Sequence, residues 1–313
     1  MTHTAPTGQV ADAVRNNWVD RWAPARWRPF LRLSRADRPA GTWLLLIPCW
    51  WGLALAAASH GWTPFAAWVA VACALGAFLM RGAGCAWNDI ADRRFDAAVA
   101  RTRSRPIPAG QATVRGALLW MAAQAVLAFG ILLTFPPLAV GLGVLSLLPV
   151  AVYPFAKRFT WWPQVFLGLA FNWGALLAWA AHAETLSPAP VLLYGAGILW
   201  TLFYDTIYAY QDIEDDALIG VRSTARRFGD RPGPWLAGFG AGAAALMAAA
   251  ALAALAGPAA WIAAAGAALL GGHLLWQWRA LVPSDPGVCL RLFRSNRDAG
   301  LLPVAAFLLA ALV

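Results

Sequence analysis

Hydrophobic residues occur in long runs along this chain, and polar residues gather in the segments between them. Nine apolar stretches each lie near the ~17–25 residues that a helix needs to cross a bilayer. Their approximate limits are 42–59, 64–84, 114–134, 138–156, 162–182, 189–208, 233–256, 258–277 and 298–313. The pattern therefore predicts an all-α fold, a polytopic membrane helical bundle of about nine transmembrane helices.

The composition agrees with a membrane protein. Of the 313 residues, 60% are hydrophobic and only 12% are charged, whereas soluble domains average about 45–50% apolar and about 25% charged residues. Membrane lipid is thus an expected partner. The net charge of +9 is also typical of proteins that bind nucleic acid, but the distribution of the charges favours another explanation.

Basic residues mark one side of the predicted bundle. If the N-terminus lies inside, all 24 Lys and Arg residues fall in inner segments, as do all acidic residues except Glu184. Cytoplasmic loops of membrane proteins carry such an excess of Lys and Arg. We therefore expect no nucleic-acid partner, an odd helix count, and an N-terminus and polar loops that face the cytoplasm.

The domain organisation follows from this topology. Residues 1–41 are predicted to be a cytoplasmic N-terminal segment with an interfacial helix, because Arg residues alternate there with Trp18, Trp22 and Trp27. Residues 42–313 are predicted to be the transmembrane domain.

One inner segment, residues 85–110, carries the first candidate chemistry. Asn88, Asp92 and Asp96 are spaced i, i+4, i+8, which on a helix places them along one stripe. Asp89 lies close to the same stripe, and a cluster of arginines that includes Arg101 follows. Oxygen ligands suit Mg²⁺, which is usually held by one or two carboxylates and substrate phosphates. The segment indicates either a site for Mg²⁺-diphosphate or a solvated charged loop.

A second inner segment, residues 205–231, has the same design. Asp205, Asp212 and Asp216 are spaced i, i+7, i+11, again one helical face, and arginines follow them. Both segments leave helices that run inward, which indicates a weak internal duplication. The predicted halves are about 42–156 and 162–277, with a final helix appended.

Together the two acidic segments predict one site. Facing each other across the bundle, they would hold two or more Mg²⁺ ions that bridge a diphosphate. Lys157 and Arg158, on the short inner loop between them, suit either a phosphate or a positive-inside anchor. Asn172 lies in mid-span, where a polar residue is either functional or a helix–helix hydrogen bond.

Several motifs identify a family resemblance. Asn-Asp-x-x-Asp-x-x-x-Asp (88–96), Arg-x-x-x-Arg-Pro-x-Pro-x-Gly (101–110) and Asp-x-x-Tyr-Ala-x-x-Asp-x-x-x-Asp (205–216) resemble the UbiA superfamily of intramembrane aromatic prenyltransferases. The likeness also includes Asp-Arg-Pro-x-Gly-Thr-Trp (37–43) and covers about residues 31–230. In detail it is similar to the bacterial branch that prenylates 4-hydroxybenzoate in ubiquinone synthesis.

This resemblance implies roles for single residues. Asn88, Asp92, Asp96, Asp212 and Asp216 would hold Mg²⁺-diphosphate. Arg101 and Lys157 would contact the phosphates, and Arg158 takes a basic position that the family needs for activity. Arg38 is the candidate for the carboxylate of the aromatic acid. Apart from the resemblance, Asn172 is a further substrate-binding candidate because of its mid-span position, and residue chemistry makes Asp89 or Asp205 the candidate that would accept the phenolic or ring proton.

The resemblance also implies the reaction and the location. We expect Mg²⁺-dependent transfer of a polyprenyl group from its diphosphate to the ring carbon ortho to the hydroxyl of 4-hydroxybenzoate, in the bacterial inner membrane. The alternatives are a sister enzyme whose acceptor is haem, a naphthoate or a chlorophyllide, and, remotely, an ion-coupled transporter. Transporter sites lie at the midplane between inverted repeats, whereas these repeats are expected to be parallel, with acids at inner helix ends.

Overall fold

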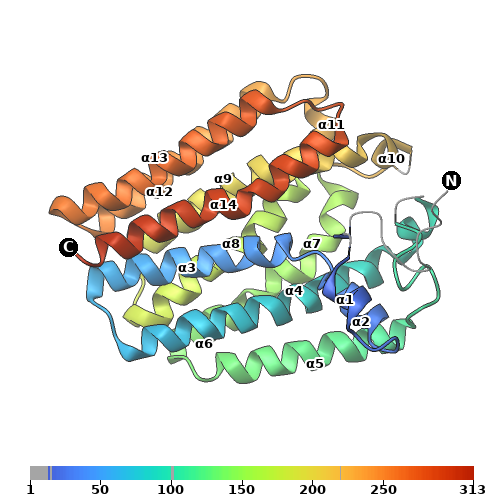
Figure 1. Cartoon of the computed structure of the whole chain (residues 1–313), viewed down its shortest axis with the longest axis horizontal. Coiled ribbons are helices and arrows are strands. Elements are labelled where there is room, and N and C mark those ends of the chain that lie inside the picture. Colours follow the sequence, from blue (N-terminus) through green and yellow to red (C-terminus); the bar gives the residue numbers. More distant parts are fainter. Residues whose placement is uncertain (1–12, 15, 100–101, 219) are drawn as a thin grey trace. The chain divides into compact units, whose positions relative to one another are not determined.

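The computed structural model describes residues 13–14, 16–99, 102–218 and 220–313, and these residues form helices and connecting segments with no strand (Figure 1). The helices are α1 (Trp18–Arg21), α2 (Arg28–Leu33), α3 (Ala40–His60), α4 (Pro64–Ala98), α5 (Val114–Leu132), α6 (Pro137–Leu145), α7 (Leu147–Phe159), α8 (Pro163–Ala183), α9 (Pro188–Ala209), η1 (Tyr210–Asp212), α10 (Ile213–Leu218), α11 (Thr224–Phe228), α12 (Gly233–Ala254), α13 (Gly257–Ala280) and α14 (Pro286–Ala310). The predicted all-α fold is confirmed.

Eight helical stretches of the described chain are long and apolar enough to cross a membrane. They match the first eight predicted segments, with α6 and α7 forming one stretch over Pro137–Phe159. The ninth predicted segment, 298–313, belongs to α14, which begins at Pro286 and carries Arg291, Arg294 and Arg297 in its first half. The count of nine spans stays a prediction.

The two acidic segments lie mostly on helices and not in the loops between them. Residues Asn88 to Asp96 lie within the last turns of α4, which runs unbroken for 35 residues because no proline follows Pro64 before Pro106. The second segment begins on α9, and the chain then tightens into the 3₁₀ turn η1 before α10. Helical backbone therefore positions most of the candidate ligands.

The N-terminal segment forms two short helices rather than one interfacial helix. Asn17 caps α1, since its side-chain oxygen accepts from the Asp20 backbone N–H, and Pro29 stands in the first turn of α2. Trp22 has 78% of its surface exposed. The division at residue 41 and the two halves of the bundle stay predictions.

The residues that the structure describes divide into two compact units. The first comprises residues 1–42 and 75–131, of which 13–14, 16–42, 75–99 and 102–131 are described; the second comprises 43–74 and 132–313. In the first unit, Gly82 lets the backbone of α4 approach α5 closely, because an added Cβ would lie 1.9 Å from Gln124 Oε1. Ser34 donates to the same oxygen at 3.0 Å, which ties the end of α2 to α5.

In the second unit, α9 is the central packing element, in contact with α8, α12 and α14. Its Trp200 is fully buried and lies 4.9 Å from Trp51 of α3, centroid to centroid. Buried amides add a polar connection: Trp200 Nε1 donates to Asn296 Oδ1 of α14, which also accepts from Gln277 of α13. The core of this unit is therefore apolar around one polar contact between three helices.

Candidate functional site

The first candidate site is one face of the last three turns of α4. Asp89, Asp92 and Asp96 are 0%, 1% and 6% exposed, and Asn88 is half-buried, whereas Arg93 and Arg94 are exposed. This division follows the helical period, so the predicted stripe of Asn88, Asp92 and Asp96 is one side of one helix. Buried carboxylates are costly unless cations compensate them.

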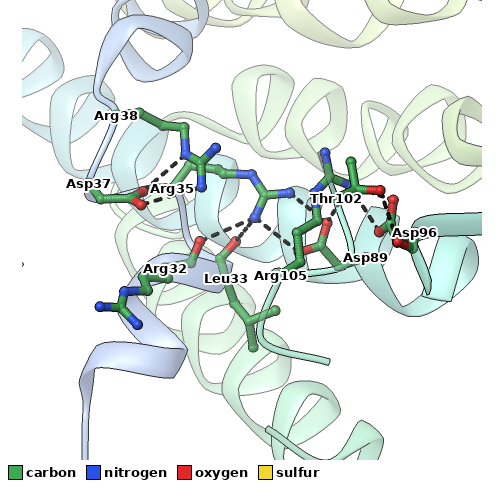
Figure 2. Close-up of polar contacts among 9 residues, drawn as sticks. All are labelled: Arg32, Leu33, Arg35, Asp37, Arg38, Asp89, Asp96, Thr102 and Arg105. Atoms are coloured by element: carbon green, nitrogen blue, oxygen red, sulfur yellow. Dashed lines mark hydrogen bonds and ion pairs between the residues drawn. The ribbon is translucent and has the colours of Figure 1, made fainter. Parts of the chain in front are cut away.

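The segment after α4 returns to the stripe and supplies a cation. Thr102 Oγ1 donates to the carbonyl of Asp96 at 3.0 Å and so holds the start of the return. Arg105 Nη1 then lies 2.9 and 3.0 Å from the two carboxylate oxygens of Asp96, and 3.4 Å from Asp89 Oδ1 (Figure 2). Arg105 therefore bridges two acids of the stripe.

A second cation comes from the N-terminal segment. The guanidinium of Arg35 points at Asp89 in Figure 2 and donates to both of its oxygens, at 2.6 and 2.9 Å. Burial lowers the pKa of Arg35, but the charge of Asp89, the hydrogen bond to it and other nearby groups together leave that pKa above its usual value. Asp89 is thus a carboxylate fixed between two guanidinium groups.

Arg38, the candidate for the acceptor carboxylate, lies beside Asp37. Its Nε and Nη2 donate to the Asp37 carboxylate at 3.1 and 3.3 Å. Burial raises the pKa of Asp37 to about 6, against the opposing charge of Arg35. Arg38 is half-buried and close in sequence to Arg35, and its role toward an aromatic acid stays a prediction.

The second acidic segment is divided between three elements. Asp205 lies on α9, Asp212 in η1 and Asp216 on α10, and all three are half-buried. The predicted single helical face is therefore wrong in detail, because the backbone changes from α to 3₁₀ at Tyr210 and the angular register changes with it. Tyr210 fixes this turn by donating to Gly229 O at 2.6 Å.

Lys157 and Arg158 occupy the last turn of α7, where cations complement the helix dipole. The chain after the second acidic segment returns to this point: the Arg222 backbone N–H donates to Lys157 O at 3.1 Å, and Arg222 Nη1 donates to Phe159 O at 2.9 Å. The guanidinium carbons of Arg222 and Arg226 lie 5.7 and 5.5 Å from the Trp161 ring. Two arginines of the returning segment thus lie against one tryptophan.

Asn172 lies in mid-helix on α8 and is 1% exposed. Its Nδ2 donates to Gly168 O at 2.9 Å and to Thr201 Oγ1 of α9 at 2.8 Å. Its Oδ1 lies against Gly197, where an added Cβ would be only 2.2 Å away. These contacts are those of a helix–helix hydrogen bond, and a substrate-binding role stays a prediction.

The donor set on α4 fits a hard divalent cation. Asn88, Asp92 and Asp96 offer only oxygen ligands, and no cage of three or more acidic, His or Cys side chains was found in the described parts of the chain. Magnesium is typically held in this way, by one or two carboxylates with waters and substrate phosphates, rather than by an all-protein cage. These residues would therefore hold a metal mainly together with its phosphate ligand.

The sequence-based assignment missed two residues. Arg105 belonged to the predicted arginine cluster, but Arg101 was chosen from that cluster and lies outside the described residues. Arg35 was passed over in favour of Arg38. The available signal was the basic i, i+3 series Arg32, Arg35 and Arg38, but no sequence rule shows which member is turned inward.

The sequence and the fold are similar to those of known proteins. Residues 45–308 match the model of the UbiA prenyltransferase family. The 4-hydroxybenzoate polyprenyltransferase, mitochondrial, of Bos taurus is 44% identical over 299 residues, which cover 95% of this chain and 78% of that protein. The apo structure of a UbiA homolog from Aeropyrum pernix K1 has a TM-score of 0.71 at 26% identity, covering 86% of this chain and 97% of that one.

A further structure resembles the fold only. It is a UbiA homolog from Archaeoglobus fulgidus bound to DMAPP and Mg²⁺, with a TM-score of 0.66 at 20% identity, covering 91% of this chain and 99% of that one.

The comparisons correct the predicted location. Relatives from Homo sapiens, Arabidopsis thaliana and Dictyostelium discoideum, at 44%, 43% and 40% identity, carry the same mitochondrial name as the bovine protein. The prediction of a bacterial inner membrane is therefore wrong on this comparison. It rested on a resemblance in motif details, and the positive-inside pattern alone does not identify a membrane.

Proposed function

This chain belongs to the UbiA prenyltransferase family, and from that premise we propose that it transfers a polyprenyl group from polyprenyl diphosphate to 4-hydroxybenzoate, with Mg²⁺ as cofactor. The named relatives support the acceptor, at 44% identity over most of both chains. Their names also support a mitochondrial membrane as the location.

One observation of the structure carries the proposal. The face of α4 buries Asp92 and Asp96 beside Asn88, and Arg105 already places a guanidinium on Asp96. Carboxylates for a metal and a cation for phosphate thus meet at one place, as a diphosphate site requires. In addition, Arg105 Nε is buried and has no hydrogen-bond partner among the described residues, so it has a donor left for a phosphate oxygen.

We propose that Asn88, Asp92 and Asp96 hold Mg²⁺ on α4 and that Asp212 and Asp216 do so on η1 and α10. Magnesium bound there would neutralise charge that develops on the diphosphate. Arg105 would donate to its oxygens. The family resemblance gives the same role to Lys157 and Arg101, and it makes Arg158 a basic residue needed for activity. The bond between the allylic carbon and the diphosphate oxygen breaks, and both electrons leave with the diphosphate. The allylic carbon then bonds to the ring carbon ortho to the hydroxyl, and that carbon loses its proton.

Other residues of the chain would keep water from the allylic cation and accept the proton that the ring loses. The apolar helices exclude water that would hydrolyse an allylic cation. Tyr208 follows Asp205 by three positions on α9, and its ring centroid lies 4.4 Å from that of Phe293 on α14. Aromatic faces stabilise cations. Asp205 is the candidate for the proton acceptor, and Arg38 is the candidate for the acceptor carboxylate.

The test is prenyl transfer in washed membranes with labelled 4-hydroxybenzoate, polyprenyl diphosphates of several lengths and Mg²⁺. We expect a prenylated hydroxybenzoate that is lost with EDTA and with Asp92→Ala. Asp298→Asn is the matched control, because Asp298 is exposed on α14 and pairs with its neighbour Arg297. No product from the folded wild-type protein with any chain length would exclude this acceptor, and haem, naphthoate and chlorophyllide acceptors would then be tried.

A further inference from the structure

Arg35 occupies a backbone position that usually belongs to glycine. Helix α2 ends at Leu33, and Arg35 follows with a φ of +57°. The Ala36 N–H donates to Leu31 O and the Arg35 N–H donates to Arg32 O, both at 3.0 Å. These two bonds form a Schellman motif, whose left-handed residue is most often Gly.

The left-handed backbone conformation of Arg35 is unfavourable, so other interactions of this residue must stabilise it. A left-handed conformation is unfavourable for a residue with a Cβ, and such outliers concentrate at functional positions. A glycine would close the same motif without this cost. The side chain of Arg35 is therefore the reason to look for a function at this position.

That side chain forms a buried bidentate ion pair. Its side chain is 8% exposed and that of Asp89 is 0% exposed, and the shortest contact is 2.6 Å. Removing one partner of such a pair leaves an uncompensated buried charge. Arg35 therefore determines whether Asp89 is neutralised.

Asp89 also has a second potential partner, Arg105. Arg105 Nη1 lies 3.4 Å from Asp89 Oδ1 but 2.9 Å from Asp96 Oδ1. Arg35, Asp89, Arg105 and Asp96 thus form a series of alternating charges in which each acid has one close arginine (Figure 2). The longer contact is the alternative that Arg105 would strengthen if Asp89 lost Arg35.

We propose that Arg35 is a positioning residue that neutralises Asp89 and thereby leaves Arg105 to Asp96 and, when substrate binds, to the diphosphate. This inference rests on the diphosphate site of the proposed function. Without Arg35, Asp89 attracts Arg105, which moves away from Asp96 and from the phosphate. The expected defect is weak diphosphate binding, with acceptor binding unchanged.

The variants exploit the backbone geometry. Arg35→Gly removes the guanidinium and suits the left-handed position, so the backbone hydrogen bonds that close α2 are kept. It also removes the hydrogen bonds that Arg35 Nη1 donates to the carbonyls of Arg32 and Leu33, at 3.2 and 3.5 Å. Arg35→Lys keeps the charge but cannot form the bidentate pair. The matched control is Arg32→Gln: Arg32 belongs to the same segment, is equally buried, and pairs with Asp20 at 2.8 Å rather than with the stripe.

Binding is measured with inorganic pyrophosphate and Mg²⁺ on the purified full chain by calorimetry, and KM values are measured in the transfer assay. We expect Arg35→Gly to weaken pyrophosphate binding and to raise the KM for prenyl diphosphate about tenfold, with the KM for 4-hydroxybenzoate unchanged. We expect Arg35→Lys to be intermediate and Arg32→Gln to stay within about twofold of wild type. These magnitudes correspond to the loss of one charge-assisted hydrogen bond, about 1.4 kcal/mol per tenfold.

The decisive variant is Arg35→Gly combined with Asp89→Asn. With Asp89 neutral, Arg105 is released, so pyrophosphate binding should return to within about threefold of wild type. A merely structural role would lower the amount of folded protein and kcat but would not move the KM for diphosphate. Unchanged pyrophosphate binding in Arg35→Gly, or a double variant that binds worse than either single variant, would overturn the proposal.

The two proposals fail in different ways. If the wild-type protein binds pyrophosphate with this variant pattern but prenylates no hydroxybenzoate, the positioning role stands and the acceptor is wrong. If the wild-type protein prenylates hydroxybenzoate and Arg35→Gly binds pyrophosphate normally, only the positioning role is wrong.

Discussion

Arg105 places Nη1 2.9 Å from Oδ1 and 3.0 Å from Oδ2 of Asp96, so its guanidinium occupies oxygens that are candidates for a metal. The same arginine is a candidate for the phosphate. In the absence of both, it compensates a buried acid. When metal and diphosphate bind together, the metal would therefore take Asp96 and the diphosphate would take Arg105. The two ligands would replace this ion pair rather than enter a preformed cage.

This exchange predicts opposite effects of Arg105→Gln on two ligands. Without the competing cation, Asp96 should bind Mn²⁺ alone about threefold to tenfold more tightly, since a neighbouring opposite charge typically alters the affinity of a carboxylate for a cation on the order of tenfold or more. Pyrophosphate binding should weaken by a similar factor. Electron paramagnetic resonance measures the Mn²⁺, and calorimetry measures the pyrophosphate.

Arg103→Gln is the control for this pair of measurements, because Arg103 lies in the same segment but is exposed. If Arg105→Gln weakened the binding of Mn²⁺ and of pyrophosphate equally, the site would collapse without Arg105. That result would contradict the proposed exchange of partners.

Asp37 predicts a pH dependence of stability. Its pKa is raised from 3.8 to about 6, mainly by burial, so the folded state binds more protons than the unfolded state between these values. Stability from this group is therefore present below pH 3.8 and is lost as the pH rises through 6, by about 2 kcal/mol between pH 4.5 and 7.5. Asp37→Asn should remove this loss.

The measurement is the apparent unfolding temperature of wild type and Asp37→Asn in detergent at both pH values. Asp37→Asn should gain on the wild type as the pH rises. A difference between the two proteins that does not change with pH would show that Arg38 and Arg35 keep Asp37 ionised throughout.

The positions of most long helices could be predicted from the sequence, because the length of an apolar run and the helical period are local properties of the chain. The stripe on α4 follows from spacing alone. The break in the second segment was not predictable from spacing. Spacing cannot show that a 3₁₀ helix begins at Tyr210, or that the Tyr210 hydroxyl donates to the carbonyl of Gly229.

The inward turn of Arg35 was also beyond sequence reasoning. Its left-handed φ is set by hydrogen bonds at the end of α2 and by an acid 54 positions away in the chain. Sequence patterns describe neighbours along a helix, whereas this contact depends on how separate segments pack. For the same reason, spacing alone could not show that Asn172 of α8 donates to Thr201 of α9.

The buried amides of the second unit predict a specific cost of substitution. Asn296 accepts from Trp200 at 2.9 Å and exchanges hydrogen bonds with Gln277 at 3.0 and 3.2 Å, and Asn296 and Gln277 are both 0% exposed. Asn296→Leu keeps the volume but leaves buried donors unpaired, which should lower stability by about 1–3 kcal/mol. Thermal unfolding in detergent measures the loss.

Combining Asn296→Leu with Gln277→Leu and Trp200→Phe should recover part of this stability, because no unpaired group then remains. Ser295→Ala is the neighbouring control, since Ser295 is only partly buried and donates to the carbonyl of Leu292 in its own helix. A triple variant less stable than Asn296→Leu would show that packing, and not hydrogen bonding, determines the cost.

The two candidates for the proton acceptor differ in their surroundings. Both oxygens of Asp89 accept from Arg35, and one also lies near Arg105. A carboxylate held in this way is a poor base, because taking a proton would break charge-assisted hydrogen bonds. Asp205 is half-buried on the last turns of α9, next to Tyr204 and close to Tyr208. The structure therefore favours Asp205.

Asp205→Asn should lower kcat about 10²-fold, within the range for loss of a general base, while the KM for prenyl diphosphate stays within about threefold. Asp89→Asn should instead leave the chemical step unchanged, because a carboxylate held by Arg35 does not act as the base. Acceptor deuterated at the ring carbons ortho to the hydroxyl should show a primary isotope effect in Asp205→Asn, since proton loss becomes slow.

Glu214→Gln, at an exposed acid on α10, is the control. An isotope effect confined to Asp89→Asn, with normal turnover in Asp205→Asn, would reassign the base to Asp89.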